Sequence, residues 1–139
     1  MSEEKAKYYF AQFSSQAPVY LIGPRPFEFA GPPLEPLIFV DRGLHHKENL
    51  KKYFTSNKFG ISIGDGDSSK LPIDIQHPPE KDLSDLALAL KLIPRECKKI
   101  QLLGFLGGRR DHELANFLET HRFLKDRISC VSHFENQAS

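Results

Sequence analysis

Short runs of large apolar residues recur along the chain, separated by longer and more polar segments. Most of these runs are apolar almost throughout and end at a glycine or an aspartate, a pattern typical of strands buried on both faces of a parallel sheet. The sequence therefore predicts five strands. They cover residues 19–22, 37–40, 59–63, 100–103 and 128–131.

Between the predicted strands, apolar residues recur every three or four positions, which is the spacing of an amphipathic helix. These helical segments cover residues 45–54, 82–92 and 111–124. Segment 23–36 is rich in proline and is unsuited to a long helix. The face of the last helix that we expect to be buried comprises Leu114, Phe117, Leu118 and Phe123.

Strands that alternate with amphipathic helices predict right-handed β-α-β crossovers. We therefore expect an α/β fold, a three-layer α/β/α sandwich around a mainly parallel, Rossmann-like sheet. The expected organisation is a single domain over residues 1–139, of which residues 1–17 form an N-terminal extension. Folds of this kind bind ligands at the carboxyl ends of their strands, so chemistry is expected at that edge.

Composition excludes several classes of partner. The formal net charge is only +1, which gives no reason to expect a nucleic-acid groove or an anionic membrane surface. No apolar run approaches the roughly 20 residues that span a bilayer, and the N-terminal residues lack the apolar core of a signal peptide. The only two cysteines, Cys97 and Cys130, are too few and too far apart in sequence to suggest a disulfide framework. We therefore expect a cytoplasmic protein with reduced thiols.

The sharpest local signal is the sequence GDGDSS at residues 64–69, directly after the third predicted strand. Asp65 and Asp67 lie two residues apart in a turn that glycine permits, so their carboxylates can converge on a hard cation such as Mg²⁺. The structural alternative is an ordinary polar turn, since Asp, Gly and Ser are common turn residues.

A second signal, KDLSD at residues 81–85, opens the second predicted helix. Asp82 and Asp85 are three residues apart and would share a face if both were helical. The alternative is that Asp82 caps the helix, because negative charge at a helix start is stabilising by about 0.3–1 kcal/mol without any further role.

A third signal, GFLGGRRDH at residues 104–112, joins a predicted strand to the last helix. Paired glycines let backbone amides approach an anion, Arg109 offers a forked donor to phosphate oxygens, and the helix presents its positive end. Asp111 is either a metal ligand or the helix cap. A weaker element is Asp41, which follows the second strand. All four elements fall at one edge of the proposed sandwich, and their clustered charges predict a bound cation or a network with basic residues.

Other catalytic signatures do not occur. The chain has no nucleophile elbow, no Walker-type phosphate loop and no dinucleotide-binding glycine pattern. His45 and His46 are adjacent, which would point them apart on a helix, and this spacing does not suggest a transition-metal site.

The three motifs, in this order, resemble those of thiamine pyrophosphokinase, whose catalytic domain runs through G-D-x-D-S, K-D-x-T-D and G-G-R-x-D-H. The resemblance covers roughly residues 19–124. It implies transfer of a pyrophosphoryl group from ATP to the hydroxymethyl group of thiamine, with release of AMP and with Mg²⁺ as cofactor.

The resemblance also implies roles residue by residue. The implied metal ligands are Asp65, Asp67 and Asp85. The implied catalytic residues are Asp65, Asp67, Asp82, Asp85 and Asp111, and the implied nucleotide-binding residues are Asp41, Gly64, Ser68, Lys81, Gly107, Gly108, Arg109 and His112.

The chain departs from the family pattern in two places that leave alternatives open. Arg42 stands where the family usually has glycine, in the element D-G-G-A. The family also carries a second, all-β domain that helps to form the thiamine pocket across a dimer interface, and this chain ends about where that domain would begin. The alternatives are a non-catalytic nucleotide-sensing or partner-binding module and a pyrophosphokinase for another heterocycle, such as a pterin. A homodimer is the default expectation.

Overall fold

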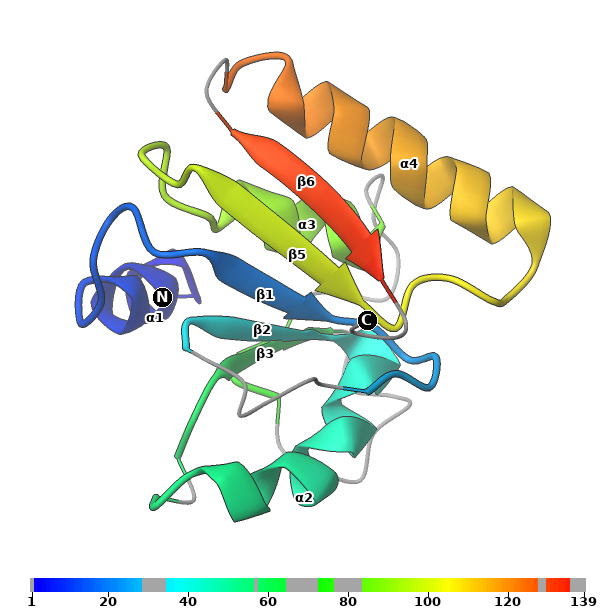
Figure 1. Ribbon diagram of the computed structural model, residues 1–139. Coiled ribbons are helices and arrows are strands. Elements are labelled where there is room, and N and C mark those ends of the chain that lie inside the picture. Colours follow the sequence, from blue (N-terminus) through cyan, green and yellow to red (C-terminus); the bar gives the residue numbers. More distant parts are fainter. Residues whose placement is uncertain are drawn as a thin grey trace.

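The computed structural model describes residues 2–28, 35–56, 58–64, 73–76, 84–127 and 130–135. These residues form a six-stranded sheet in the order β4-β3-β2-β1-β5-β6, in which every neighbouring pair is parallel (Figure 1). The prediction of a parallel α/β fold is thus confirmed. The strands are β1 (Val19–Ile22), β2 (Leu37–Val40), β3 (Ile61–Gly64), β4 (Ile75–Gln76), β5 (Lys99–Leu103) and β6 (Val131–Glu135).

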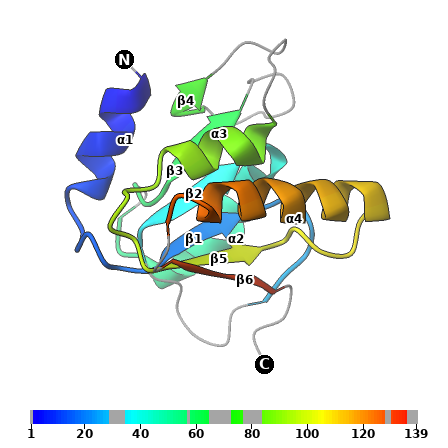
Figure 2. The same cartoon turned by 90° about the horizontal axis from the view of Figure 1, so that it is seen from above.

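Helices flank both faces of the sheet. The apolar residues of α1 (Ser2–Phe10), α3 (Asp85–Lys91) and α4 (Arg110–Leu124) pack into one core cluster, and α3 and α4 run side by side (Figure 2). The second cluster is smaller and lies under η1 (Asp41–His46), α2 (Lys47–Leu50) and η2 (Lys51–Tyr53). No helix in the described part of the chain has the length and apolar character needed to cross a membrane.

Burial along the strands follows this layering. All four residues of β2 are buried, because helices cover both of its faces. In β5, Ile100 and Leu102 are buried in the larger cluster, whereas Lys99 and Gln101, which point to the opposite face, are only half-buried. The smaller helical layer therefore covers the centre of the sheet more completely than its β5 side.

A largely buried hydrogen-bond network joins α1 to the amino ends of β2 and β3. The Tyr9 hydroxyl donates to Glu35 Oε2 over 2.7 Å and accepts from the Leu37 N–H over 2.9 Å. Glu35 Oε2 also accepts from the Gly60 N–H over 2.8 Å. Burial, together with the neighbouring Glu35 carboxylate, raises the pKa of Tyr9 far above its ordinary value, so the phenol stays protonated.

The strand predictions need three corrections. The third predicted strand was placed too early, because Gly60 has a φ of +70° and β3 begins only at Ile61. A sixth strand, β4, was not predicted, because two residues are too few to show any periodicity. The last strand was placed too early, since β6 begins at Val131, and the Cys130 N–H instead closes a turn on the Arg127 carbonyl. The two cysteines, Cys97 and Cys130, are buried and do not form a disulfide.

The helix predictions also need corrections. Segment 45–54 is a short α-helix between two 3-10 turns, and α1 was not predicted. The predicted buried face of α4 is wrong for three of its four residues, with Leu114 58%, Phe117 42% and Leu118 48% exposed. This helix lies beside the outermost strand (Figure 1), where the Phe117 ring meets Phe134 of β6 with ring centroids 4.6 Å apart. It also packs through Thr120 and the half-buried Phe123.

Candidate active site

The strand order places a topological switch point at the carboxyl ends of β1 and β5. The chain leaves β1 toward β2 on one side, while β5 and β6 continue the sheet on the other. Open parallel sheets bind ligands at such points. A cavity of about 840 Å³ lies here, lined by residues from four different segments, among them Arg25, Asp41, Asp85 and Arg109.

Backbone segments approach each other closely beneath this cavity. A Cβ added at Gly43 would lie 2.0 Å from the Ile22 carbonyl oxygen, which no side chain could tolerate. Gly104 has a φ of +83°, and a Cβ there would lie 2.7 Å from the Arg25 carbonyl oxygen. The glycines therefore let the ends of β1 and β5 and the start of η1 meet at one point.

Asp41 occupies an unusual position at the end of β2. Its φ of +50° is left-handed, a conformation that costs a non-glycine residue roughly 1–3 kcal/mol and that recurs at functional sites. A Cβ added at Gly64, the last residue of β3, would lie 3.4 Å from Asp41 Oδ1. The early aspartate therefore lies against the first residue of the GDGDSS motif, as the convergence argument predicted.

The start of α3 is fixed by Ser84. Its hydroxyl accepts a hydrogen bond from the Ala87 N–H over 3.1 Å, which makes Ser84 the N-cap, and it donates to the Glu119 carboxylate of α4. The interpretation of Asp82 as the cap is therefore wrong, because α3 begins at Asp85. Asp85 is half-buried in the first turn and lines the cavity.

The glycine-rich turn before α4 is held by carboxylates. The Gly107 N–H donates to Glu113 Oε1 over 2.6 Å, so this amide is already used. Arg109 pairs with Asp111 over 2.7 Å, and both side chains are largely exposed. Because exposed ion pairs contribute only about 0–1 kcal/mol, Arg109 can exchange Asp111 for a phosphate at little cost. Asp111 is not the helix cap, since Arg109 occupies that position.

The structure brings some predicted site residues together and leaves others apart. Those that line the cavity are Asp41, Asp85, Gly108, Arg109 and His112. Gly64, Gly107 and Asp111 lie next to lining residues through the contacts given above. Asp65, Asp67, Ser68, Lys81 and Asp82 lie outside the described residues.

The sequence interpretation missed residues that support the cavity. His45 and His46 do not point apart: their ring centroids are 4.0 Å apart. His45 Nε2 donates to the Pro24 carbonyl over 3.0 Å, and His46 Nε2 donates to the Arg25 carbonyl over 3.1 Å. Burial, and then the neighbouring His45, lower the pKa of His46. Only the three-dimensional structure could reveal these contacts, because the partners are 21 residues apart.

The charges around the cavity are mixed in sign. Carboxylates come from Asp41, Asp85, Glu113 and Glu119, and guanidinium groups come from Arg25, Arg42 and Arg109. Oxygen ligands of this kind suit a hard divalent cation, and guanidinium forks suit phosphate. Within the described ranges, no three His, Cys, Asp or Glu side chains gather into a metal-binding group, so Asp41 and Asp85 supply part of a ligand set at most.

The fold and the cavity define a doubly wound α/β domain with its charged site at the topological switch point. The sequence matches the thiamin pyrophosphokinase catalytic domain over residues 35–132. The chain therefore belongs to this family, as the order of its motifs predicted. No curated protein gives a significant sequence match.

A solved structure supports the fold assignment. The fold is similar to that of a probable thiamine pyrophosphokinase from Staphylococcus saprophyticus subsp. saprophyticus, with a TM-score of 0.50 and 21% sequence identity. The alignment covers 86% of this chain and 64% of that chain. The present chain thus spans less than two thirds of the length of that relative.

Proposed function

We propose that the chain is the catalytic part of a Mg²⁺-dependent diphosphotransferase that moves a pyrophosphoryl group from ATP to the hydroxymethyl group of thiamine and releases AMP. The observation that carries this proposal is the convergence of Asp41, Asp85 and Arg109, from three separate segments, on one cavity at the switch point. The family match over residues 35–132 supports it.

Asp41 and Asp85 would hold the metal ion, together with the predicted ligands Asp65 and Asp67. Carboxylate oxygens are the ligands that Mg²⁺ prefers, and the cation would neutralise charge on the polyphosphate. The left-handed backbone at Asp41 fits this role, because it places the carboxylate beside the end of β3, where the GDGDSS motif begins.

The remaining chemistry is positioning of the phosphates. Gly108 and Arg109 line the cavity at the start of α4, where backbone N–H groups and the helix dipole favour an anion. Glu113 fixes the turn through the Gly107 N–H. In the proposed reaction, the acceptor hydroxyl oxygen bonds to the β-phosphorus of ATP, the bond from that phosphorus to the α-phosphate oxygen breaks, and the hydroxyl proton passes to a base.

The acceptor site and the oligomeric state are part of the proposal as well. The related structure is longer than this chain, and we propose that a further segment or a second subunit of a homodimer completes the thiamine pocket. A pyrophosphokinase acting on another hydroxymethyl heterocycle, such as a pterin, would need the same phosphate site but a different acceptor pocket.

A second candidate is a nucleotide-binding module without catalytic turnover. Arg42 favours this alternative, because its exposed side chain lines the cavity at a position where the family usually has glycine. Such a module would bind MgATP without consuming it.

Release of AMP from ATP and Mg²⁺ by the purified chain, with and without thiamine, separates these functions. We expect thiamine-dependent AMP release, and we expect Asp85→Asn to lower it roughly 100-fold because one transition-state contact is lost. The control is Asp126→Asn, an exposed carboxylate beyond the end of α4. ATP binding without AMP release would indicate either the non-catalytic module or an enzyme whose thiamine pocket a further segment completes. Absence of any nucleotide binding would exclude both.

A further inference from the structure

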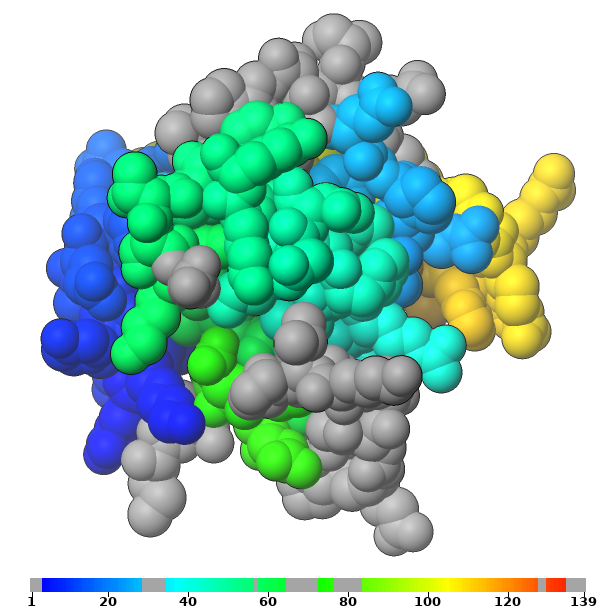
Figure 3. All heavy atoms as spheres, turned by 90° about the horizontal axis from the view of Figure 1, so that it is seen from below, coloured from blue at the N-terminus to red at the C-terminus, as the bar shows by residue number. Residues whose placement is uncertain are grey.

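Arg25 lies in the loop that leaves β1, three residues after its last residue, Ile22. Its Nη2 donates to the Gly107 carbonyl oxygen over 2.9 Å, and the side chain lies next to Gly108. In the space-filling view from below (Figure 3), the light-blue residues of this loop lie beside the yellow start of α4. Arg25 therefore reaches across the switch point from β1 to the glycine-rich turn.

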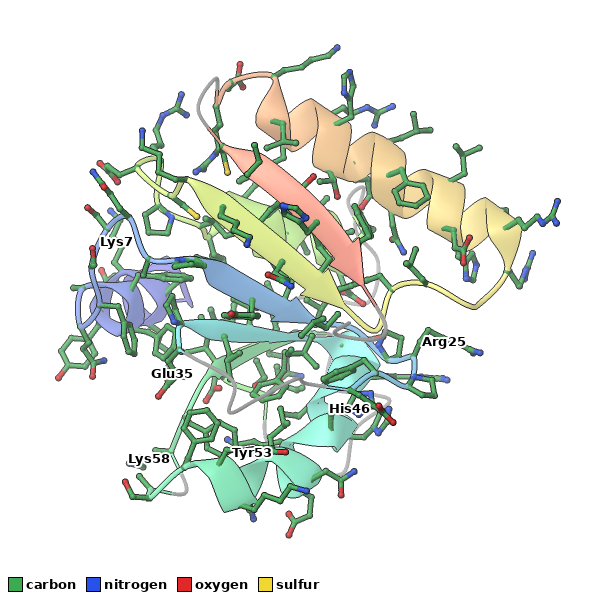
Figure 4. The ribbon with its side chains drawn as sticks, viewed as in Figure 1. Lys7, Arg25, Glu35, His46, Tyr53 and Lys58 are labelled. Atoms are coloured by element: carbon green, nitrogen blue, oxygen red, sulfur yellow. The ribbon has the colours of Figure 1, made fainter. Side chains whose placement is uncertain are left out.

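The backbone around Arg25 is fixed on both sides. The Arg25 N–H donates to the Gly104 carbonyl over 2.8 Å, and its carbonyl accepts from His46 Nε2 over 3.1 Å. The preceding carbonyl, that of Pro24, accepts from His45 Nε2 over 3.0 Å. Figure 4 shows Arg25 and His46 at the same end of the sheet. Because the backbone is already ordered, a ligand that binds the guanidinium group pays little further entropy for ordering this loop.

Arg25 also differs from Arg109 in how its charge is paired. Arg109 is paired with Asp111, whereas no carboxylate pairs with Arg25 within the part of the chain that the structure describes. Arg25 makes its contact with Gly107 through a neutral carbonyl oxygen, which leaves further guanidinium N–H groups for an acceptor. Since the Gly107 N–H is occupied by Glu113, the turn needs another donor to hold a polyphosphate.

We propose that Arg25 is a phosphate-binding residue of the nucleotide site, contacting the polyphosphate of ATP while its Nη2 holds the Gly107 carbonyl. This inference rests on the proposed function, and it adds a residue that lies before the family match, which begins at residue 35. The guanidinium fork would bridge the loop after β1 and the turn before α4, so that both sides of the cavity close on the same anion.

Competition binding tests this role. In the experiment, a fluorescent ATP analogue is bound to the full chain in the presence of Mg²⁺. ATP, inorganic tripolyphosphate and adenosine are then used in turn as competitors. We expect Arg25→Gln to lower the affinity for ATP and for tripolyphosphate about tenfold, which is the size of one charge-assisted contact. We expect the affinity for adenosine to stay unchanged. Arg110→Gln is the matched control, because it removes the same charge from an exposed residue that does not line the cavity, and we expect a change below about twofold.

A second variant and a folding check keep the test decisive. Arg25→Lys retains the charge and the aliphatic stem but loses the fork, and we expect an affinity between those of the wild type and Arg25→Gln. Thermal unfolding shows whether each variant is folded. If the wild type binds ATP and both Arg25 variants bind it equally well, the inference is refuted while the proposed function stands. If the wild type itself binds no nucleotide, the proposed function fails and the inference fails with it.

Discussion

The two ends of the parallel sheet are closed in different ways. At the amino end, side chains fill the space, because the Tyr9 hydroxyl and the Glu35 carboxylate satisfy the backbone N–H groups of Leu37 and Gly60. At the carboxyl end, the backbones meet through glycines, and the charged side chains above them border a cavity of about 840 Å³. Figure 4 shows Glu35 at one end and Arg25 at the other. One end of the sheet serves stability, and the other leaves room for a ligand.

The largest expected effect on stability comes from a substitution that disrupts the close backbone contacts at the carboxyl end. Gly43→Ala would place a Cβ 2.0 Å from the Ile22 carbonyl oxygen, and the backbone would have to move. We expect the free energy of unfolding to fall by at least about 3 kcal/mol, measured by urea denaturation.

Gly108→Ala is the matched control at the same end. Its added Cβ would meet only the Arg25 side chain, at 3.6 Å, which is an ordinary contact. We expect a change within about 0.5 kcal/mol. Equal destabilisation by the two substitutions would contradict the view that the backbone crossing at Gly43, rather than glycine content, holds this end together.

A smaller effect is expected at the amino end. Tyr9→Phe removes the hydroxyl that donates to Glu35 and leaves the buried Leu37 N–H without this acceptor. We expect a loss of ~1–3 kcal/mol in the free energy of unfolding and no change in nucleotide affinity. Tyr8→Phe serves as the control, because Tyr8 is 76% exposed. A clear loss of nucleotide affinity in a folded Tyr9→Phe variant would show that the two ends are not separate in function.

The smallest effect concerns pH at the carboxyl end. The pKa of His46 is lowered in the folded chain by burial and by His45, from an ordinary value of 6.5. The unfolded chain therefore binds the proton more tightly, so the stability provided by neutral His46 is present above pH 6.5 and is lost as the pH falls below it.

We expect the free energy of unfolding to decrease between about pH 7 and pH 5, and His46→Gln to reduce this dependence while keeping a donor for the Arg25 carbonyl. His121→Gln, on the exposed side of α4, should leave the dependence unchanged. The same pH profile in wild type and His46→Gln would show that other groups cause it.

The sequence predicted much of the sheet and part of the site. Continuous apolar runs located β1, β2, β3 and β5, because both faces of a central parallel strand demand apolar side chains. The sequence also predicted that Asp41, Asp85 and Arg109 lie near one another, because the carboxyl ends of parallel strands share an edge, and all three line one cavity. Periodicity and topology were sufficient for these features.

What the sequence did not reveal depends on contacts between distant segments. The apolar residues Leu114 and Leu118 suggested a buried face, but α4 lies beside the last strand and leaves both side chains about half exposed. Ser84 caps α3 and contacts Glu119, 35 residues away. Arg25 appeared to be one residue of a proline-rich loop until its partner, Gly107, was located 82 residues away. No local pattern encodes such pairs.

Titration of isotope-labelled protein with MgATP, followed through the backbone amide NMR signals, tests the central claim most directly. The account predicts that shifts concentrate at Arg25, Asp41, Asp85 and residues 104–112, while the signals of Tyr9, Leu37 and Gly60 at the amino end stay unchanged. Shifts centred on the amino end, or no shifts at any ATP concentration tested, would contradict it.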